Sequence, residues 1–248
     1  MKLTILNANL WLLPPPSSVD NTNRLNKFIA LAKKLDPDII NLQEVWLNEY
    51  IKKLKKSFKN YYLVSPRSII YNKSGLVTIS KYKPKKWKYH QYKITREFGL
   101  VERLANKGYL KLEIKINNKL LNLFNTHIYE SPHPNKQFIK ETQAKSLKKE
   151  ILKNNISIAT GDLNLKLSSF KKIFPNIITE QNPLNTYLEE NKYTKMIFNQ
   201  LKNRTGIYNR KPDYILVNSK SKKISIQTKV IKKPLISDHY PFIAEVDF

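Results

Sequence analysis

The stretch from residue 156 to residue 164, Ile-Ser-Ile-Ala-Thr-Gly-Asp-Leu-Asn, constrains the fold more than any other part of the chain. Its apolar, β-branched first half has the length and composition of a buried strand. We expect that strand to break at Gly161, where the chain can turn without a Cβ penalty. Asp162 and Asn164 then lie just beyond its carboxyl end, which is where ligands gather in α/β sheets. Taken alone, Gly-Asp-x-Asn fits a loop with an Asx-type turn equally well.

A short apolar run followed by polar residues recurs along the chain and predicts many short strands. Helices are predicted where apolar residues recur every three or four positions, at residues 21–35, 48–58 and 135–152. Strands are expected at residues 3–10, 39–42, 61–64, 75–80, 87–94, 107–116, 120–126, 156–159, 214–217, 224–230 and 241–246. Asn117-Asn118 predicts a hairpin turn, whereas residues 165–210 predict only short helical pieces and polar loops.

The balance of these elements indicates the fold class. Strands outnumber helices, and hairpin-like pairs alternate with helical crossovers. This mixture predicts an α/β (α+β) fold, in which two mainly antiparallel or mixed sheets pack face to face with helices outside. A chain of 248 residues without an internal repeat or a linker is expected to form one domain, residues 1–248.

Composition excludes several classes of site. The chain has no Cys, which excludes disulfides, thiolate metal sites and a Cys nucleophile. No apolar run reaches about 18 residues, which argues against a membrane span. We therefore expect a soluble, cytoplasmic protein, or a secreted protein whose leader is not part of this sequence.

The formal net charge of +26 predicts an anionic partner, either nucleic acid or an acidic membrane surface. Only six of the 45 basic residues are Arg, and Arg is the residue on which base-specific recognition usually depends. The abundant Lys accompanies abundant Asn and Ile, so part of the basicity is attributed to compositional drift on solvated faces. The charge alone does not choose between the two partners.

Polar side chains stand at the ends of several predicted strands, and together they form an oxygen-rich set with two imidazoles. Such a set suits a hard divalent cation, because Mg²⁺ takes one or two protein carboxylates, keeps waters and uses substrate phosphate as a ligand. Zinc with two carboxylates stays open, although no His-x-x-x-His pair is present. The residues in question are Asn9, Glu44, His127, Asp162, Asn164, Asp213, Asp238 and His239.

The order of six short motifs resembles the endonuclease/exonuclease/phosphatase superfamily. The motifs are Leu-Asn-Ala-Asn, Leu-Gln-Glu-Val, Asn-Thr-His, Gly-Asp-Leu-Asn, Pro-Asp-Tyr-Ile and Ser-Asp-His-Tyr-Pro, and they extend from Asn9 to Pro241. Each is weak alone, but six in this order form a specific pattern. The resemblance implies a DNase I-like, four-layered sandwich of two mixed sheets flanked by helices. It also implies cleavage of phosphate esters with Mg²⁺, or with Mn²⁺ in its place.

The resemblance assigns a cation site to the first, second and last motifs. Glu44 would be the main metal ligand, helped by Asn9 and Asp238.

The remaining motif residues would then act on the water and the phosphate. His239 would be the general base that takes a proton from the attacking water, oriented by Asp213. Asp162 would position that water or help to deprotonate it. Asn164 and His127 would donate hydrogen bonds to the phosphoryl oxygens as charge develops.

Within the superfamily, two segments are similar to neutral and bacterial sphingomyelinases. One is Asn9-Leu10-Trp11 followed by a Pro-rich loop, and the other is the Lys107-Gly108 pair that starts a predicted strand. Glu102 stands where the sphingomyelinase pattern has Asp. Lys107 is therefore interpreted either as a contact to substrate phosphate or as a surface residue. No long aromatic hairpin of the kind that bacterial sphingomyelinases use on membranes is found.

Three functional hypotheses follow. The first is a sphingomyelinase-like, Mg²⁺-dependent phosphodiesterase that acts on a phospholipid, as a monomer with peripheral membrane contact. The second is a nuclease or DNA-end phosphodiesterase, motivated by the basic composition. The third is a non-catalytic binding module that keeps the fold.

Overall fold

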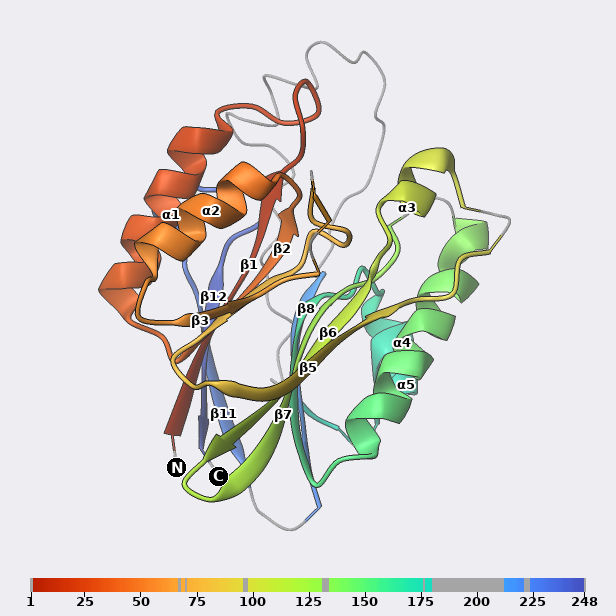
Figure 1. The fold of residues 1–248 in the computed structure, drawn as a ribbon. Coiled ribbons are helices and arrows are strands. Elements are labelled where there is room, and N and C mark those ends of the chain that lie inside the picture. Colours follow the sequence, from red (N-terminus) through yellow and green to blue (C-terminus); the bar gives the residue numbers. More distant parts are fainter. Residues whose placement is uncertain are drawn as a thin grey trace.

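The computed structural model describes residues 2–66, 68–69, 71–95, 98–130, 134–175, 177–179, 212–220 and 224–247. In this part of the chain, two six-stranded sheets lie face to face with helices on both outer sides (Figure 1). Much of the poorly predicted stretch 165–210, from residue 180 onward, lies outside the described residues. The expected four-layered α/β sandwich is confirmed.

The first sheet has the strand order β11-β12-β1-β2-β4-β3. Its strands are β1 (Lys2–Leu12), β2 (Ile39–Val45), β3 (Tyr62–Val64), β4 (Val77–Ser80), β11 (Ser225–Val230) and β12 (Phe242–Asp247). The second sheet has the order β5-β6-β7-β8-β10-β9. Its strands are β5 (Pro84–Gln91), β6 (Gly108–Ile116), β7 (Lys119–His127), β8 (Ile156–Asp162), β9 (Ile178–Thr179) and β10 (Asp213–Ser219).

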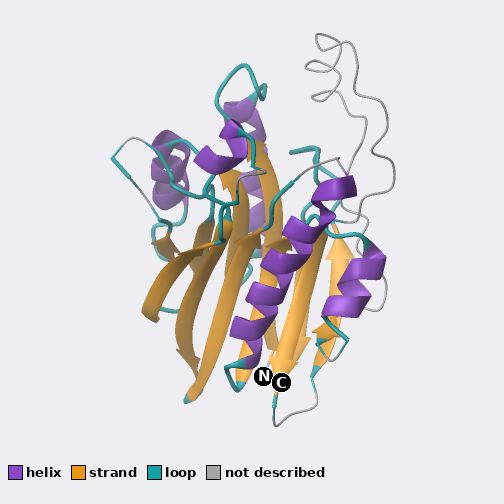
Figure 2. Ribbon diagram, turned by 90° about the vertical axis from the view of Figure 1, so that its right-hand side faces the viewer, coloured by secondary structure: helices purple, strands orange, loops and turns teal. Residues whose placement is uncertain are grey.

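The helices divide between the two outer faces. Figure 1 shows α1 (Asn21–Leu35) and α2 (Asn48–Ser57) beside the first sheet, and Figure 2 shows α4 (Gln137–Leu152) and α5 (Leu167–Ile173) in front of the second. A 3-10 turn, η1 (Pro134–Lys136), precedes α4, and the short α3 (Leu100–Leu104) was not predicted. None of the described helices is long and apolar enough to cross a membrane.

The two sheets repeat the same pattern of strand pairing. Each has one parallel pair at its centre, β1 with β2 and β7 with β8, and antiparallel pairs on both sides of it. A helix connects the strands of each parallel pair, α1 in one case and α4 in the other. Parallel strands need such a crossover, and it brings the carboxyl ends of both strands to the same edge.

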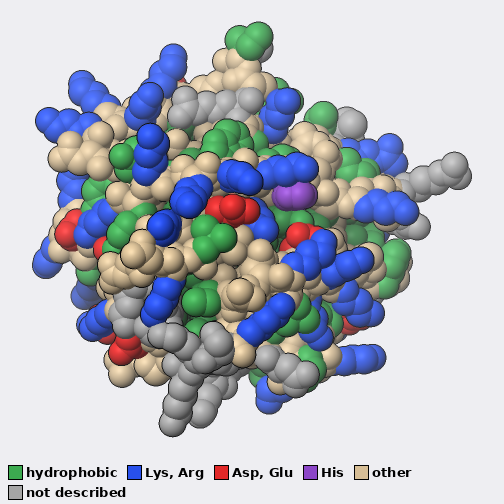
Figure 3. Space-filling model, turned by 60° about the horizontal axis from the view of Figure 1, so that its bottom comes forward, with side chains coloured by type: hydrophobic (Ala, Val, Ile, Leu, Met, Phe, Trp, Pro, Cys, Tyr) green, Lys and Arg blue, Asp and Glu red, His purple; other side chains and the backbone are tan. Residues whose placement is uncertain are grey.

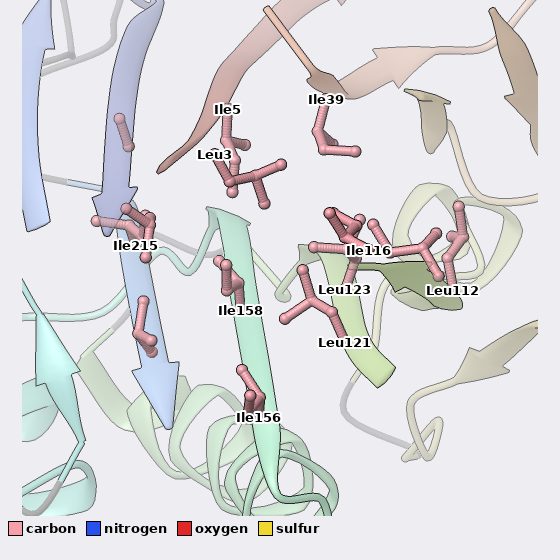
Figure 4. Packing of buried hydrophobic residues seen from close by; sticks show 14 of the residues in the cluster. Leu3, Ile5, Ile39, Leu112, Ile116, Leu121, Leu123, Ile156, Ile158 and Ile215 are labelled. Atoms are coloured by element: carbon pink, nitrogen blue, oxygen red, sulfur yellow. The ribbon is translucent and has the colours of Figure 1, made fainter. Parts of the chain in front are cut away.

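Alternation along the strands places apolar side chains in separate layers. Leu3 and Ile5 of β1 face Ile158 of β8 in the core between the sheets (Figure 4). Leu6 and Leu10 point the other way, toward α1 and α2. A third cluster lies between the second sheet and its helices α4 and α5.

The same alternation turns the polar residues of the strand ends inward. In β8, Ile156 and Ile158 belong to the core between the sheets, so Asp162 faces that side as well. Register then brings residues of three strands together, because His127 pairs with Asp162 and Asp213 pairs with the same residue from the other side. The predicted hairpin is confirmed, with Asn117 and Asn118 both at positive φ, as a tight two-residue turn requires.

One local prediction is wrong. The strand does not break at Gly161, because β8 continues through it to Asp162. Gly161 is needed for a different reason: it has φ +152°, and a Cβ added there would overlap the carbonyl oxygen of Thr126 on the neighbouring strand. The glycine permits close approach of two backbones, which is a recognised role of glycine in strands.

We expect Gly161→Ala to lower the free energy of unfolding by at least about 2 kcal/mol, because the new methyl group must displace β7 from β8. Chemical denaturation followed by circular dichroism measures this. Gly99→Ala is the matched control, since nothing lies within 4 Å of a Cβ at that position. Equal stability of the two variants would contradict the role given to Gly161.

Candidate active site

Asn9 joins the two sheets at the carboxyl ends of their central strands. Its Nδ2 donates to Glu44 Oε1 at 2.9 Å and to Asp162 Oδ2 at 3.2 Å. Glu44 belongs to the first sheet and Asp162 to the second, so one amide connects a carboxylate from each. Asn9 Oδ1 accepts a hydrogen bond from the backbone N–H of Trp11 at 3.0 Å, which fixes the orientation of the amide.

His239 and Asp213 form a buried pair on the other side of Asp162. His239 Nδ1 lies 2.8 Å from Asp213 Oδ2, and its Nε2 lies 4.0 Å from Asp162 Oδ2. With Asp213 Oδ2 as the acceptor, Nδ1 carries a proton and Nε2 is turned toward Asp162. Burial alone would lower the pKa of His239, but the neighbouring carboxylates, Asp213 foremost, raise it well above its ordinary value.

His127 lies between the two linked carboxylates. Its Nε2 is 3.6 Å from Asp162 Oδ2 and 3.9 Å from Glu44 Oε1, and its side chain is almost completely buried. Neither ring nitrogen has a hydrogen-bond partner among the described residues. Burial, with a smaller contribution from Lys107, holds the pKa of His127 well below its ordinary value, so the ring is neutral.

The backbone at the ends of β1 and β2 has an irregular conformation that directs the side chain of Glu44 toward the site. Leu42 and Val45 both face the helix layer, so strict alternation would not leave Glu44 at the site. Glu44 instead has φ +58°, and Trp11 opposite it has φ +48° where the register of β1 and β2 shifts. Bulges and positive φ at non-glycine residues are costly and concentrate at functional sites.

Asn164 follows β8 in a tight turn, also with positive φ. Its backbone N–H donates to Asp162 Oδ1 at 3.0 Å, and its Nδ2 donates to the carbonyl oxygen of Ile128 at 3.2 Å. The Asx-type turn considered for this stretch is therefore present, and it holds the Asp162 carboxylate in place.

The carboxylates of this cluster are poorly compensated in the protein alone. Burial, with a further contribution from Asp238, raises the pKa of Glu44 to about 8. Burial likewise raises the pKa of Asp162 to about 7 and raises that of Asp238. Ser237 Oγ donates to Asp238 Oδ1 at 3.0 Å. The shifts mean that the ionised forms lack sufficient positive charge around them.

Lys107 is not a surface residue, which removes one of its two interpretations. Its side chain is buried, and Nζ lies 3.6 Å from Glu102 Oε1. Burial opposes the charged form, yet Glu102, Glu130, Glu44 and Asp162 together raise its pKa, so the ammonium group stays charged. The electrostatic influence of Glu44 and Asp162 places this cation beside the carboxylate cluster.

A divalent cation fits the donor set. Mg²⁺ needs only one or two carboxylates and completes its shell with water and substrate oxygens. The negative charge of Asp238 adds to the raised pKa of Glu44, so a cation near both would favour the ionised form of Glu44. Asn9 Oδ1 keeps a second lone pair besides the one that Trp11 uses. Within the described residues, no group of three or more His, Asp or Glu forms a complete protein cage for a metal. The arrangement therefore suits a partly hydrated ion rather than a closed structural site.

Sequence patterns missed two kinds of residue that shape the site. Arg24 of α1 is completely buried and contacts the segments next to Asn9 and Asp238, as described below. In the sequence, the position of Arg24 on the apolar stripe of the helix, beside Leu25 and Phe28, could have indicated that it is buried. Amides inside apolar strands, such as Asn125, gave a second signal, because a polar residue on a buried face needs a partner.

Comparison with known proteins connects this geometry to a family. The family model described as "Endonuclease/Exonuclease/phosphatase family" matches residues 6–239. No curated protein sequence matches the chain.

Several solved structures share the fold. A beta toxin from Staphylococcus aureus with bound magnesium ions is 20% identical with a TM-score of 0.78, over 98% of this chain and 99% of the other. Sphingomyelinase C from Streptomyces griseocarneus is 14% identical with a TM-score of 0.78, over 100% of both chains. D. rerio TDP2 complexed with a single-strand DNA product is 16% identical with a TM-score of 0.78, over 100% and 99%. At these identities the likeness concerns the fold.

We expect MgCl₂ or MnCl₂ to stabilise the protein, because a cation that binds only the folded state adds about 2.7 kcal/mol at a hundredfold excess over its Kd. For a chain of this length, that corresponds to a rise of about 5–10 °C in Tm, measured by thermal unfolding with and without chelator. Glu44→Gln should abolish the rise, whereas Glu49→Gln, an exposed site on α2, should keep it. A full shift in the Glu44→Gln protein would exclude Glu44 as a ligand.

Proposed function

The chain belongs to the endonuclease/exonuclease/phosphatase family, and from this premise we propose that it is a Mg²⁺-dependent phosphodiesterase with a phospholipid as substrate. The observation that carries the proposal is the continuous series of contacts from Glu44 through Asn9 and Asp162 to His239 and Asp213. It joins the proposed cation ligand to the proposed proton acceptor across one buried carboxylate, Asp162. A non-catalytic binding module would have no need of this costly arrangement.

In the proposed site, Glu44 holds the metal with help from Asn9 and Asp238. A bound Mg²⁺ supplies Lewis acidity that neutralises charge on a phosphoryl oxygen. Burial of Glu44 matters to this role, because a desolvated carboxylate with a raised pKa gains most from a cation.

His239 is the proposed general base. Without a cation, the surrounding carboxylates raise the pKa of His239, and a bound cation that offsets their charge would favour the neutral ring. The Asp213 hydrogen bond then holds the proton on Nδ1, so Nε2 is the nitrogen that takes the proton from the attacking water. Asp213 then stabilises the imidazolium that results, as a carboxylate does in other acid–base pairs. Asp162, 4.0 Å from Nε2, orients the water toward the phosphorus.

Three further side chains are proposed to bind the phosphoryl oxygens. His127 is neutral and keeps one N–H for donation, and Asn164 has a second amide hydrogen besides the one given to Ile128. Lys107 contributes a buried positive charge, and such charges act strongly where water is excluded. All three stabilise negative charge that grows in the transition state.

Two exposed apolar residues that follow β2 and α2 favour a phospholipid surface. Ile69 is 99% exposed, and Tyr71, two positions further along the chain, is also exposed. Ser68 N–H donates to the Tyr71 carbonyl oxygen at 2.8 Å, and Asn48 Nδ2 donates to the carbonyl oxygens of Ser68 and Ile69 at 3.1 and 3.0 Å. These bonds display an isoleucine to solvent, where it gains nothing unless a partner covers it.

The base of this turn is attached to the strand that carries Glu44. Asn72 N–H donates to the Trp46 carbonyl oxygen at 2.8 Å, and the N–H of Val45 donates to the Gly75 carbonyl oxygen at 2.9 Å. Lys73 beside the turn is exposed. An apolar tip next to lysine is the combination that binds a membrane containing acidic lipids.

Nucleic acid is the second candidate, and the net charge of +26 favours it. That charge is not gathered in one patch on the face shown in Figure 3, where Lys and Arg side chains are scattered among apolar and polar ones. The feature that favours lipid over nucleic acid is the exposed apolar turn.

A substrate panel tests the proposal. Sphingomyelin in mixed micelles, phosphoinositides, plasmid DNA and single-stranded DNA are each assayed with Mg²⁺ and with chelator. We expect phosphomonoester release from lipid that chelator abolishes, and a loss of about 10²–10⁴ in kcat for His239→Asn, the size of a general-base contribution. His90→Asn on β5 should leave the rate unchanged. Cleavage of DNA alone, falling steeply with salt, would establish the second candidate instead.

Ile69→Asp should weaken binding to vesicles of phosphatidylcholine and phosphatidylserine by roughly 4- to 12-fold, since about half of the 1.5–3 kcal/mol for a buried isoleucine is lost. Sedimentation measures this in a Glu44→Gln background, which prevents hydrolysis. Leu120→Asp, at an exposed position on the β6–β7 hairpin at the opposite end, is the control. Undiminished binding by Ile69→Asp would remove the turn from the membrane contact.

A further inference from the structure

Arg24 places a guanidinium group in the apolar layer between the first sheet and the helices α1 and α2. It lies on the stripe of α1 that also carries Leu25, Phe28 and Ala32, and its side chain has no exposed surface. Moving a charged group out of water is very costly unless every donor finds a partner. Its presence here therefore requires a purpose that an apolar side chain would not serve.

All five N–H donors of Arg24 are used, four of them on backbone carbonyl oxygens. Nε donates to Val19 at 2.9 Å, Nη1 to Leu10 at 2.7 Å and to Ile236 at 2.9 Å, and Nη2 to Trp11 at 2.7 Å. The fifth bond runs from Nη2 to Asn21 Oδ1 at 2.6 Å. The guanidinium plane thus holds three separate stretches of chain in one fixed arrangement.

Two of these stretches carry the candidate site. Leu10 and Trp11 follow Asn9 directly, at the point where β1 loses its regular register with β2. Carbonyl groups at such a bulge are left without ladder partners, and Arg24 satisfies both. Ile236 precedes Asp238 and His239 by two and three residues.

We propose that Arg24 is a positioning residue that fixes the Asn9 end of β1 relative to the segment bearing Asp238 and His239. The inference rests on the proposed function for the roles of Asn9, Asp238 and His239. The link that Arg24 makes between the two stretches is given by its hydrogen bonds alone. Arg24 donates to backbone carbonyl groups on both stretches at once.

Lysine cannot take over this task, although it keeps the charge. An ammonium group offers three donors from one point, whereas the guanidinium offers five in a plane. Arg24→Lys therefore leaves at least two buried acceptors without a partner and frees one stretch from the other. Support of this kind, one step removed from the ligands, is worth about 10–100-fold in metal affinity or activity.

The test compares Arg24→Lys with Leu54→Ala, a buried residue of α2 in the same apolar layer that makes no polar contact with the site. Three quantities are measured: Mn²⁺ affinity by water-proton relaxation, the downfield proton resonance of the His239–Asp213 hydrogen bond, and kcat against KM. The resonance is assigned by its loss in Asp213→Asn.

We expect Arg24→Lys to weaken Mn²⁺ binding at least about tenfold, to shift or broaden the resonance, and to lower kcat more than KM rises. Leu54→Ala should lose stability with none of these changes. If Arg24→Lys behaves as Leu54→Ala does in all three, Arg24 is merely structural and the proposal is overturned.

If Arg24→Lys does not fold, Asn21→Ala tests the positioning role of Arg24 instead. This substitution removes one acceptor of the Arg24 guanidinium, Asn21 Oδ1, and leaves the guanidinium in place. In Asn21→Ala, a smaller loss of Mn²⁺ affinity together with a smaller shift of the resonance supports the positioning role of Arg24. Unchanged Mn²⁺ affinity with an unchanged resonance overturns it. If the wild-type protein hydrolyses no phosphodiester, the proposed function fails. The Mn²⁺ affinity and the His239–Asp213 resonance still test the positioning role of Arg24 in that case.

Discussion

Asn125 stands at the centre of a hydrogen-bonded layer that joins the two sheets. Its Nδ2 donates to the carbonyl oxygens of Leu42 at 3.0 Å and Val77 at 2.9 Å in the first sheet, and its Oδ1 accepts from Gln43 Nε2 at 2.7 Å. Apolar contact is non-directional and would tolerate sliding of one sheet over the other. Directional bonds in a dry interior permit one register. Every contact between a residue of one sheet and a residue of the other at the rim depends on that register.

The site is acidic, although the protein as a whole is strongly basic. The overall positive charge acts on an anionic ligand at long range, whereas the carboxylates act on it at short range. Lysines scattered over the surface give a field that draws polyanions from afar, and this field weakens beyond a Debye length. At close range, Glu44, Asp162 and Asp238 would repel a phosphate ester, and their raised pKa values show the shortage of positive charge there. Under the proposed function, a divalent cation would resolve the conflict, since it would compensate the carboxylates and present positive charge to the substrate.

Much of this arrangement was accessible from the sequence, because it depends on local signals. Short apolar runs with polar ends predicted the strands, and the motif order pointed to Glu44 and His239. Gly161 was misinterpreted because a glycine that ends a strand and one that admits a neighbouring backbone look alike in sequence. Arg24 was passed over since its acceptors are carbonyl groups far along the chain, and Asn125 since the register between sheets is non-local. Hydrogen bonds to backbone leave no pairing signal in side-chain types.

The shared pairing pattern of the two sheets determines how the side chains of the cluster are supplied. Each half of the sandwich contains a β-α-β unit, and each unit ends in a polar residue on its first strand and a carboxylate on its second: Asn9 and Glu44 in one, His127 and Asp162 in the other. Each half of the sandwich therefore supplies two of the four side chains that meet between the sheets, and neither half alone contains the cluster. A change that separated the two halves would break up the cluster even if each β-α-β unit kept its own structure.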